Sequence, residues 1–182
     1  LTLYFIRLDY ILKKWCQNMK VLFVVPEIRI DSGPMHFPFW AGILAAIVEQ
    51  KGGNVGILDL NSLRMNFGGK EFPDKMIEEE VSREEWDLIA IGGLTSTYKR
   101  IKELTPIIHR ASPKSLLVAG GGWSSYNPDE ILKLVPEINM ICIGEGEETF
   151  SEIYDQIENG QRDFDKVAGL CIRDNRGIRF TE

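Results

Sequence analysis

Three glycine-rich segments carry the residues whose types and spacing suit the binding of a ligand. They read GGLTST at residues 92–97, GGGWSS at residues 120–125 and GEGEET at residues 144–149. Glycine lets a backbone bend sharply or approach another molecule closely. The Thr and Ser hydroxyl groups offer hydrogen bonds among small side chains. Such segments are typical of a cleft that holds a large, neutral or weakly polar ligand through shape, backbone amides and hydroxyl groups.

Phosphate chemistry fits these segments poorly. A P-loop needs a lysine after its glycines, and neither GGGWSS nor GEGEET contains one. The GEGEET segment is close to a dinucleotide fingerprint, but its glutamates would repel a pyrophosphate. Those glutamates suit the positive end of a helix dipole equally well. A response regulator needs a phospho-acceptor aspartate after its third strand, and residues 88–97 contain none.

A catalytic constellation does not emerge from the remaining polar residues. The only histidines are His36 and His109, and neither stands at a recognisable spacing from Ser124 or Ser125 as a base would. The three cysteines are far apart and form no CxxC pair, so neither a zinc site nor a disulfide framework is indicated. The sequence therefore predicts a binding function.

The composition is that of an ordinary globular domain. The 182 residues are 44% hydrophobic and 26% charged, which fits one domain with a few extra elements. A net charge of −6 argues against a nucleic-acid partner, which needs a basic surface. No apolar stretch reaches the roughly 18 residues of a membrane span. We expect a cytoplasmic protein without a membrane partner, in which residues 1–18 form an N-terminal extension with an amphipathic helix.

Five short apolar runs, each followed by a turn or loop, predict the strands that position the glycine-rich segments. Because helical patterns alternate with these runs, residues 19–165 are expected to form a flavodoxin-like, doubly wound α/β domain. We predict a parallel five-stranded sheet of order 2-1-3-4-5, with the turns after several strands at one edge. Residues 61–69 read as a loop, and Pro106 should kink or shorten its helix. Residues 166–182 read as a C-terminal β-hairpin.

The order of these motifs resembles the cobalamin (B12)-binding N-terminal domain of class B radical SAM enzymes. The segments that carry the resemblance are DLIAIGGLTST, VAGGGWSSYNPDEIL, INMICIGEGEETFSEI and GLCIRDNRGIRF. The match runs from about Met19 to the end of the chain. Each motif is weak alone, but their order and spacing together are fairly specific.

The resemblance implies cobalamin at the carboxyl edge of the sheet, with its nucleotide tail between sheet and helices. The cofactor-binding residues that it implies are Gly93, Leu94, Thr95, Ser96, Thr97, Gly120, Gly121, Gly122, Trp123, Gly144, Glu145, Gly146 and Glu147. Trp123 stands where the family has Pro-His, so it either stacks on the ligand or covers the sheet edge. The Asp-x-His-x-x-Gly motif is absent, so a histidine ligand to cobalt, including His36, is not expected. We expect Gly121→Val to abolish ligand binding and leave the fold largely intact.

The resemblance also implies a longer enzyme. S-adenosylmethionine and a 4Fe-4S cluster would belong to a downstream radical SAM barrel, and this chain alone would not be catalytic. Methyl transfer to an unreactive carbon is the chemistry implied for the whole, with ring rearrangement as another possibility. Two alternatives stay open: a degenerate module that docks the barrel without cobalamin, and a flavin-binding flavodoxin-like protein.

Overall fold

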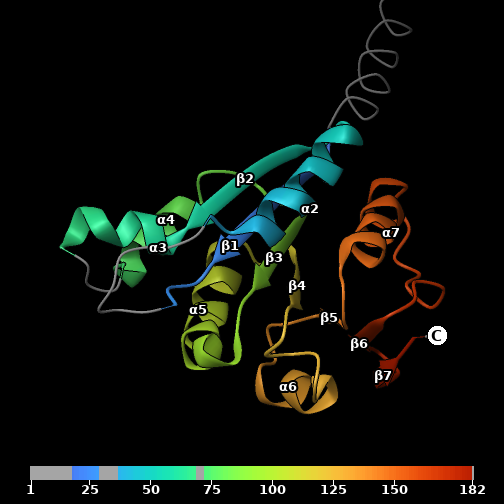
Figure 1. Cartoon of the computed structure of the whole chain (residues 1–182). Helices are drawn as coiled ribbons and strands as arrows, with labels where there is room; N and C mark the ends of the chain where they lie inside the picture. The colour runs from blue at the N-terminus through green and yellow to red at the C-terminus, as the bar shows by residue number, and fades with distance from the viewer. Residues whose placement is uncertain (1–17, 29–36, 69–71, 182) are drawn as a thin grey trace, which may run out of the picture.

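The computed structural model describes residues 18–28, 37–68 and 72–181 (Figure 1). The predicted helix of residues 1–18 lies outside the described residues except for Asn18, and His36 lies outside them too. The strands are β1 Lys20–Val25, β2 Asn54–Asp59, β3 Leu88–Gly92, β4 Leu116–Gly120, β5 Met140–Cys142, β6 Leu170–Asp174 and β7 Gly177–Phe180. The helices are α2 Phe39–Gln50, α3 Leu60–Leu63, η1 Arg64–Phe67, α4 Asp74–Val81, η2 Thr95–Thr97, α5 Tyr98–Ala111, α6 Pro128–Leu134 and α7 Glu147–Glu158.

The strands form one sheet of order β2-β1-β3-β4-β5-β6-β7. The first five strands pair in parallel, which confirms the flavodoxin-like class and the predicted order 2-1-3-4-5. The prediction of a five-stranded sheet is wrong, because the C-terminal hairpin joins the sheet. Strand β6 pairs antiparallel with β5, with Ile141 opposite Cys171, and β7 pairs with β6.

The physical reason for this difference lies in the edge of the sheet. Without a neighbour, β5 would leave a row of backbone groups unpaired. Strand β6 covers that edge, and Leu170, Cys171 and Ile172 are buried there. The alternation of apolar residues indicates a hairpin, but it does not say which strand the hairpin pairs with.

Helices cover both faces of the sheet (Figure 1). One hydrophobic cluster joins α2 and α7 to one face, through residues such as Val48, Phe150 and Phe23. A second cluster joins α4, α5 and α6 to the other face, through residues such as Ile77, Leu104 and Leu132. Strands β1, β3, β4 and β5 are therefore buried on both faces, as their unbroken apolar sequences require. The edge strand β2 is mostly exposed or half-buried.

The structure differs from two local predictions, the loop of residues 61–69 and an early end of the helix at Pro106. Residues 61–69 were expected to form a loop, but α3 and η1 fill most of this segment because the Asp59 carboxylate caps the amides of Asn61 and Ser62. Helix α5 continues through Pro106 to Ala111. The carbonyl of Lys102, which Pro106 cannot bond, accepts a hydrogen bond from Thr105 Oγ1 at 3.5 Å. Among the described ranges, none of the helices has the length and apolar character needed to cross a membrane.

Candidate functional site

Side-chain size decreases along one face of three neighbouring strands toward their carboxyl ends. On the face that α2 and α7 cover, each strand presents a large residue, then a smaller one, then glycine. The three series are Leu88–Ala90–Gly92 in β3, Leu116–Val118–Gly120 in β4 and Met140–Cys142–Gly144 in and just after β5. The space between the sheet and these helices therefore widens toward the carboxyl edge, because the sheet offers less side-chain volume there.

Helices α2 and α7 meet at the opposite end of this face. Lys51 Nζ, just after α2, lies 2.6 Å from the Asp155 carboxylate of α7. A side chain on Gly53 would touch Tyr154, which is fully buried, so the two helices approach closely at the amino edge. The widened space is thus closed at one end by helix packing and open at the other.

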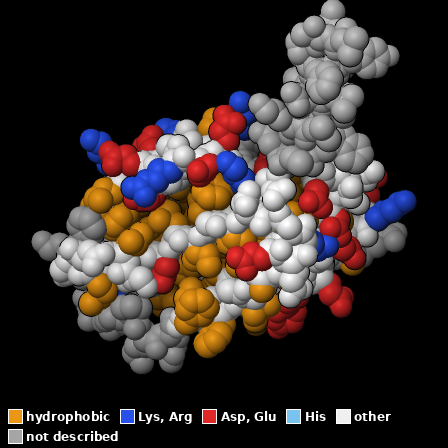
Figure 2. All heavy atoms as spheres, turned by 90° about the horizontal axis from the view of Figure 1, so that it is seen from above, with side chains coloured by type: hydrophobic (Ala, Val, Ile, Leu, Met, Phe, Trp, Pro, Cys, Tyr) orange, Lys and Arg blue, Asp and Glu red, His pale blue; other side chains and the backbone are white. Residues whose placement is uncertain are grey.

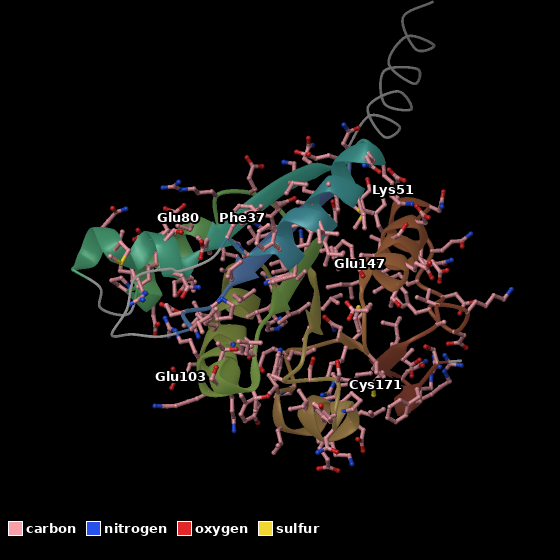
Figure 3. The ribbon with its side chains drawn as sticks, viewed as in Figure 1. Phe37, Lys51, Glu80, Glu103, Glu147 and Cys171 are labelled. Carbon is pink, nitrogen blue, oxygen red and sulfur yellow. The ribbon has the colours of Figure 1, made fainter. Side chains whose placement is uncertain are left out.

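A cavity of about 590 Å³ occupies the widened end. Its volume lies within the range of small-molecule sites, roughly 300–1,000 Å³. Its walls come from the loop after β1, the start of α2, the segment after β2 and the turns after β3, β4 and β5. Phe37, just before α2, and Glu147, at the start of α7, line it from two different elements (Figure 3).

Most of the predicted binding residues line this one cavity. The residues that do so are Gly93, Leu94, Thr97, Gly120, Gly121, Gly122, Gly144, Glu145, Gly146 and Glu147. Thr95, Ser96 and Trp123 are not among its lining residues. Thr95 and Ser96 are exposed in η2, which follows β3.

Trp123 covers the other face of the sheet. Its side chain is 6% exposed and belongs to the hydrophobic cluster beneath α4, α5 and α6. The indole packs against Tyr98 with ring centroids 5.8 Å apart, and its Nε1 donates to the carbonyl of Gly120 at 2.9 Å. Of the two roles left open for Trp123, this geometry favours covering the sheet edge.

The hydroxyl groups of the glycine-rich segments shape their own turns. Thr97 Oγ1 donates to the carbonyl of Leu94 at 2.7 Å, and Ser124 Oγ donates to that of Gly121 at 3.2 Å. Ser125 Oγ donates to the same Gly121 carbonyl and accepts from the amide of Gly144, which ties the turn after β4 to the turn after β5. These bonds fix the glycine backbone at the mouth of the cavity.

The glycines of these turns fall into two kinds. Gly121 has a φ of +93°, and a Cβ there would lie 2.6 Å from the carbonyl oxygen of Gly93. Both features require glycine at this position for the fold. The structure therefore contradicts the expectation that Gly121→Val leaves the fold largely intact. At Gly122 and Gly146, by contrast, a Cβ would meet nothing within 4 Å and would point into open space.

The charged and sulfur groups of the cavity are few. Asp59, Arg64, Glu145 and Glu147 line it, and the rest of its wall is largely apolar or glycine. Burial raises the pKa of the Cys142 thiol to about 12, so this lining group stays protonated at neutral pH. Among the described residues, no group of three or more His, Cys, Asp and Glu could hold a metal ion.

Sequence reasoning missed the part of the cavity that follows β1 and β2. Pro26 and Ile28 follow β1, Trp40 lies at the start of α2, and Asn61 and Arg64 follow β2. The reversal of strand order beside β1 places the loop after β1 at the ligand-binding edge, but it does not identify which residues form the wall. From the sequence, residues 27–38 read as a loop, and Phe39 was assigned to the apolar stripe of the helix that follows.

Large apolar side chains stand exposed around the cavity. Phe39 is 70% exposed, Phe37 61%, Leu94 57% and Ile28 43%, and all of them line it. Figure 2 shows one face of the molecule from above, on which hydrophobic side chains gather across the middle while charged ones lie mostly toward the margins. Grouped exposed apolar residues of this kind mark a surface that a ligand or partner covers.

Comparisons with known proteins agree with this geometry. The family model of the B12 binding domain matches residues 28–154. The chain is 32% identical over 122 residues to an anaerobic magnesium-protoporphyrin IX monomethyl ester cyclase of Synechocystis, covering 66% of this chain and 24% of that protein. It is 25% identical over 165 residues to an uncharacterized methyltransferase of Pyrococcus horikoshii, covering 88% of this chain and 34% of that protein. The chain thus spans about a quarter to a third of the length of these relatives.

Two solved structures share the fold. The radical S-adenosylmethionine methyltransferase TsrM of Kitasatospora setae, with cobalamin and a [4Fe-4S] cluster bound, superposes with a TM-score of 0.72 at 20% identity, covering 88% of this chain and 30% of that one. The cobalamin-dependent S-adenosylmethionine radical enzyme OxsB superposes with a TM-score of 0.74 at 17% identity, covering 91% of this chain and 22% of that one. The family match spans most of the chain, and the chain belongs to the B12-binding domain family.

Proposed function

We propose that the cavity binds cobalamin, with the nucleotide tail in the widened space between the sheet and helices α2 and α7. The observation that carries this proposal is the decrease in side-chain size along β3, β4 and β5. It opens a space beside bare glycine backbone at the carboxyl edge. That is the edge at which open α/β sheets bind their ligands.

The residues present suit such a ligand. The wall is mostly apolar, with few charged side chains among glycines, which suits a large ligand held mainly by shape and backbone contacts. Gly122 and Gly146 leave open space that a larger residue would fill. The cavity is smaller than a whole cobalamin, and the exposed side chains of Phe37, Phe39 and Leu94 supply apolar surface for the rest of it.

The role of this chain is to hold and orient the cofactor. Cobalamin, when bound, supplies a cobalt centre able to carry a methyl group. The apolar walls from β1, α2 and α7 would exclude water from the ligand, and the backbone of the glycine turns would approach it closely. In the described ranges, no cluster of side chains offers itself as a metal site.

We further propose that the domain serves a radical SAM barrel in the same protein, which holds S-adenosylmethionine and a 4Fe-4S cluster. The support is that TsrM and OxsB are radical enzymes of this kind by name, and that the relatives are three to four times longer than the matched region. Strand β7 ends beside Leu170, near the cavity edge of the sheet, so residues 166–182 would lead the chain toward the barrel. Methyl transfer is the proposed reaction of the whole.

The proposal is tested by mixing the 182-residue chain with hydroxocobalamin, desalting it and recording the absorbance spectrum. We expect a corrin spectrum that elutes with the protein at about one equivalent. A colourless protein would contradict the proposal, and a protein that instead retains flavin would support the flavodoxin-like alternative.

A further inference from the structure

The loop after β1 is held in place by the side chain of Asn61. Asn61 Nδ2 donates to the carbonyl of Pro26 at 2.7 Å, and the amide of Ile28 donates to Asn61 Oδ1 at 2.8 Å. Backbone pairing between β1 and β2 ends at Val25 opposite Asp59. The side-chain amide of Asn61 therefore continues the ladder beyond the last backbone pair, as a strand residue would.

Asn61 is itself firmly placed. Its backbone amide donates to the Asp59 carboxylate at 3.0 Å. The Asn61 residue is only 7% exposed, and it lines the cavity. Removing one half of its amide would leave a buried backbone group without its partner.

Glu27 holds the same loop from another direction. Its carboxylate accepts from Arg100 Nε at 2.9 Å and from the amide of Phe72 at 3.0 Å. The Glu27 side chain is 1% exposed, and Arg100 also pairs with Asp74 at 3.3 Å. The loop is therefore tied to the segment after β2, to α5 and to the residues before α4.

This double attachment keeps an apolar side chain in an exposed position. Ile28 lines the cavity and is 43% exposed, although its amide is fixed by Asn61. When this wall is already rigid before the ligand binds, less conformational entropy is lost in ordering the loop on binding. We propose that Asn61 is a positioning residue, which holds the wall formed by Pro26 and Ile28 ready for the corrinoid. This inference rests on the proposed cobalamin site.

The sharpest variant is Asn61→Asp. It keeps the size of the side chain and the acceptor for the Ile28 amide, but it puts a carboxylate oxygen beside the Pro26 carbonyl in place of a donor. We expect hydroxocobalamin binding at pH 8 to weaken about tenfold, mainly through faster dissociation. The neighbouring Asp59 carboxylate disfavours a second negative charge. At pH 5 the new carboxyl group should therefore be protonated more often than at pH 8 and donate to Pro26 again, which lessens the loss of affinity.

Ser62→Ala is the matched control, because Ser62 lies in the same turn and bonds Asp59 but not the loop. It should bind as the wild type does at both pH values. Wild-type affinity of the Asn61→Asp chain at pH 8, or an equal loss at both pH values, would overturn the inference. A wild-type chain that binds no hydroxocobalamin at all would instead overturn the proposed function.

Hydrogen exchange on the ligand-free wild-type chain tests the inference without any variant. The Ile28 amide should exchange at least tenfold more slowly than an exposed amide, because Asn61 Oδ1 accepts its hydrogen. Exchange at the rate of an unprotected amide would show that the wall is not held before the ligand arrives, and would contradict the proposal.

Discussion

The two faces of strands β3, β4 and β5 are filled in different ways. On the face beneath α5 and α6, Ile91 of β3 and Ile143 after β5 keep large side chains near the carboxyl edge. Strand β4 has Ala119 there, and Trp123 covers the end of the sheet. On the face beneath α2 and α7, side chains shrink to glycine at the same edge, and a cavity of about 590 Å³ remains. The same strands thus build a hydrophobic core on one side and a binding site on the other.

The difference shows that alternate residues of one strand can serve stability and ligand binding separately. Because successive side chains point to opposite faces, Leu117 can be buried in the core beneath α5 and α6 while its neighbour Val118 lines the cavity. A substitution at this edge should therefore affect either unfolding or binding, depending on which face it alters.

The largest effect should come from Trp123→Ala, on the filled face. Loss of the buried indole leaves a void and removes the hydrogen bond to Gly120. The free energy of unfolding should fall by roughly 3–5 kcal/mol. Urea unfolding measures this loss, and the folded protein should retain cobalamin affinity within about threefold. Unchanged stability with lost binding would mean that Trp123 serves the ligand.

Substitution of Gly120 on the tapered face should produce the opposite result. A Cβ there would meet only Cys142 Cβ at 3.8 Å, an ordinary contact, and valine suits a strand. Gly120→Val should keep the free energy of unfolding within about 1 kcal/mol and weaken hydroxocobalamin binding about 100-fold, equivalent to roughly 2.7 kcal/mol. The affinity of Gly120→Ala for hydroxocobalamin should lie between those of the wild type and Gly120→Val. Equal affinity across this series, measured by titration, would place the ligand elsewhere.

The smallest effect concerns the two buried cysteines, which lie on opposite faces. Burial raises the pKa of Cys142 to about 12 and that of Cys171 to about 11, so alkylation by iodoacetamide at pH 8 should be slow at both. Only Cys142 lines the cavity, so hydroxocobalamin should slow its alkylation further and leave Cys171 unchanged. Mass spectrometry of the two peptides measures this. Equal protection of both thiols would contradict the difference between the faces.

The same pKa values set the direction of a pH effect. The thiols of the folded protein titrate above the ordinary value of 9.0, so the folded state retains its protons longer than the unfolded state does. The stability that the two raised pKa values contribute is complete below pH 9. It is lost as the pH rises toward 11 for Cys171 and toward 12 for Cys142.

The strands and the glycine-rich turns could be predicted from the sequence because their signals are local, and the strand order followed from the flavodoxin-like fold class that they indicate. Each strand is a short apolar run, and three of them end in glycine, so a parallel sheet with functional turns at one edge follows directly. The place of the hairpin could not be predicted, because the alternation of Leu170, Ile172, Ile178 and Phe180 does not identify a partner strand.

The wall after β1 could not be predicted, because it depends on contacts between distant residues. Asn61 and Pro26 are 35 positions apart, and Glu27 and Arg100 are 73 apart. No local pattern marks an asparagine that pairs with a neighbouring strand. The role of Trp123 also stayed open. Glycine allows many backbone conformations, so the alternation of side chains in β4 does not predict which face of the sheet the residue after the glycines will cover.

A crystal structure of the chain with hydroxocobalamin tests the central claim most directly. We predict density for the nucleotide tail between the sheet and helices α2 and α7, in contact with Gly120, Gly122 and Gly146. The Trp123 face should remain free of ligand. A corrinoid bound elsewhere, with the cavity beside Gly120 filled by solvent, would contradict the account.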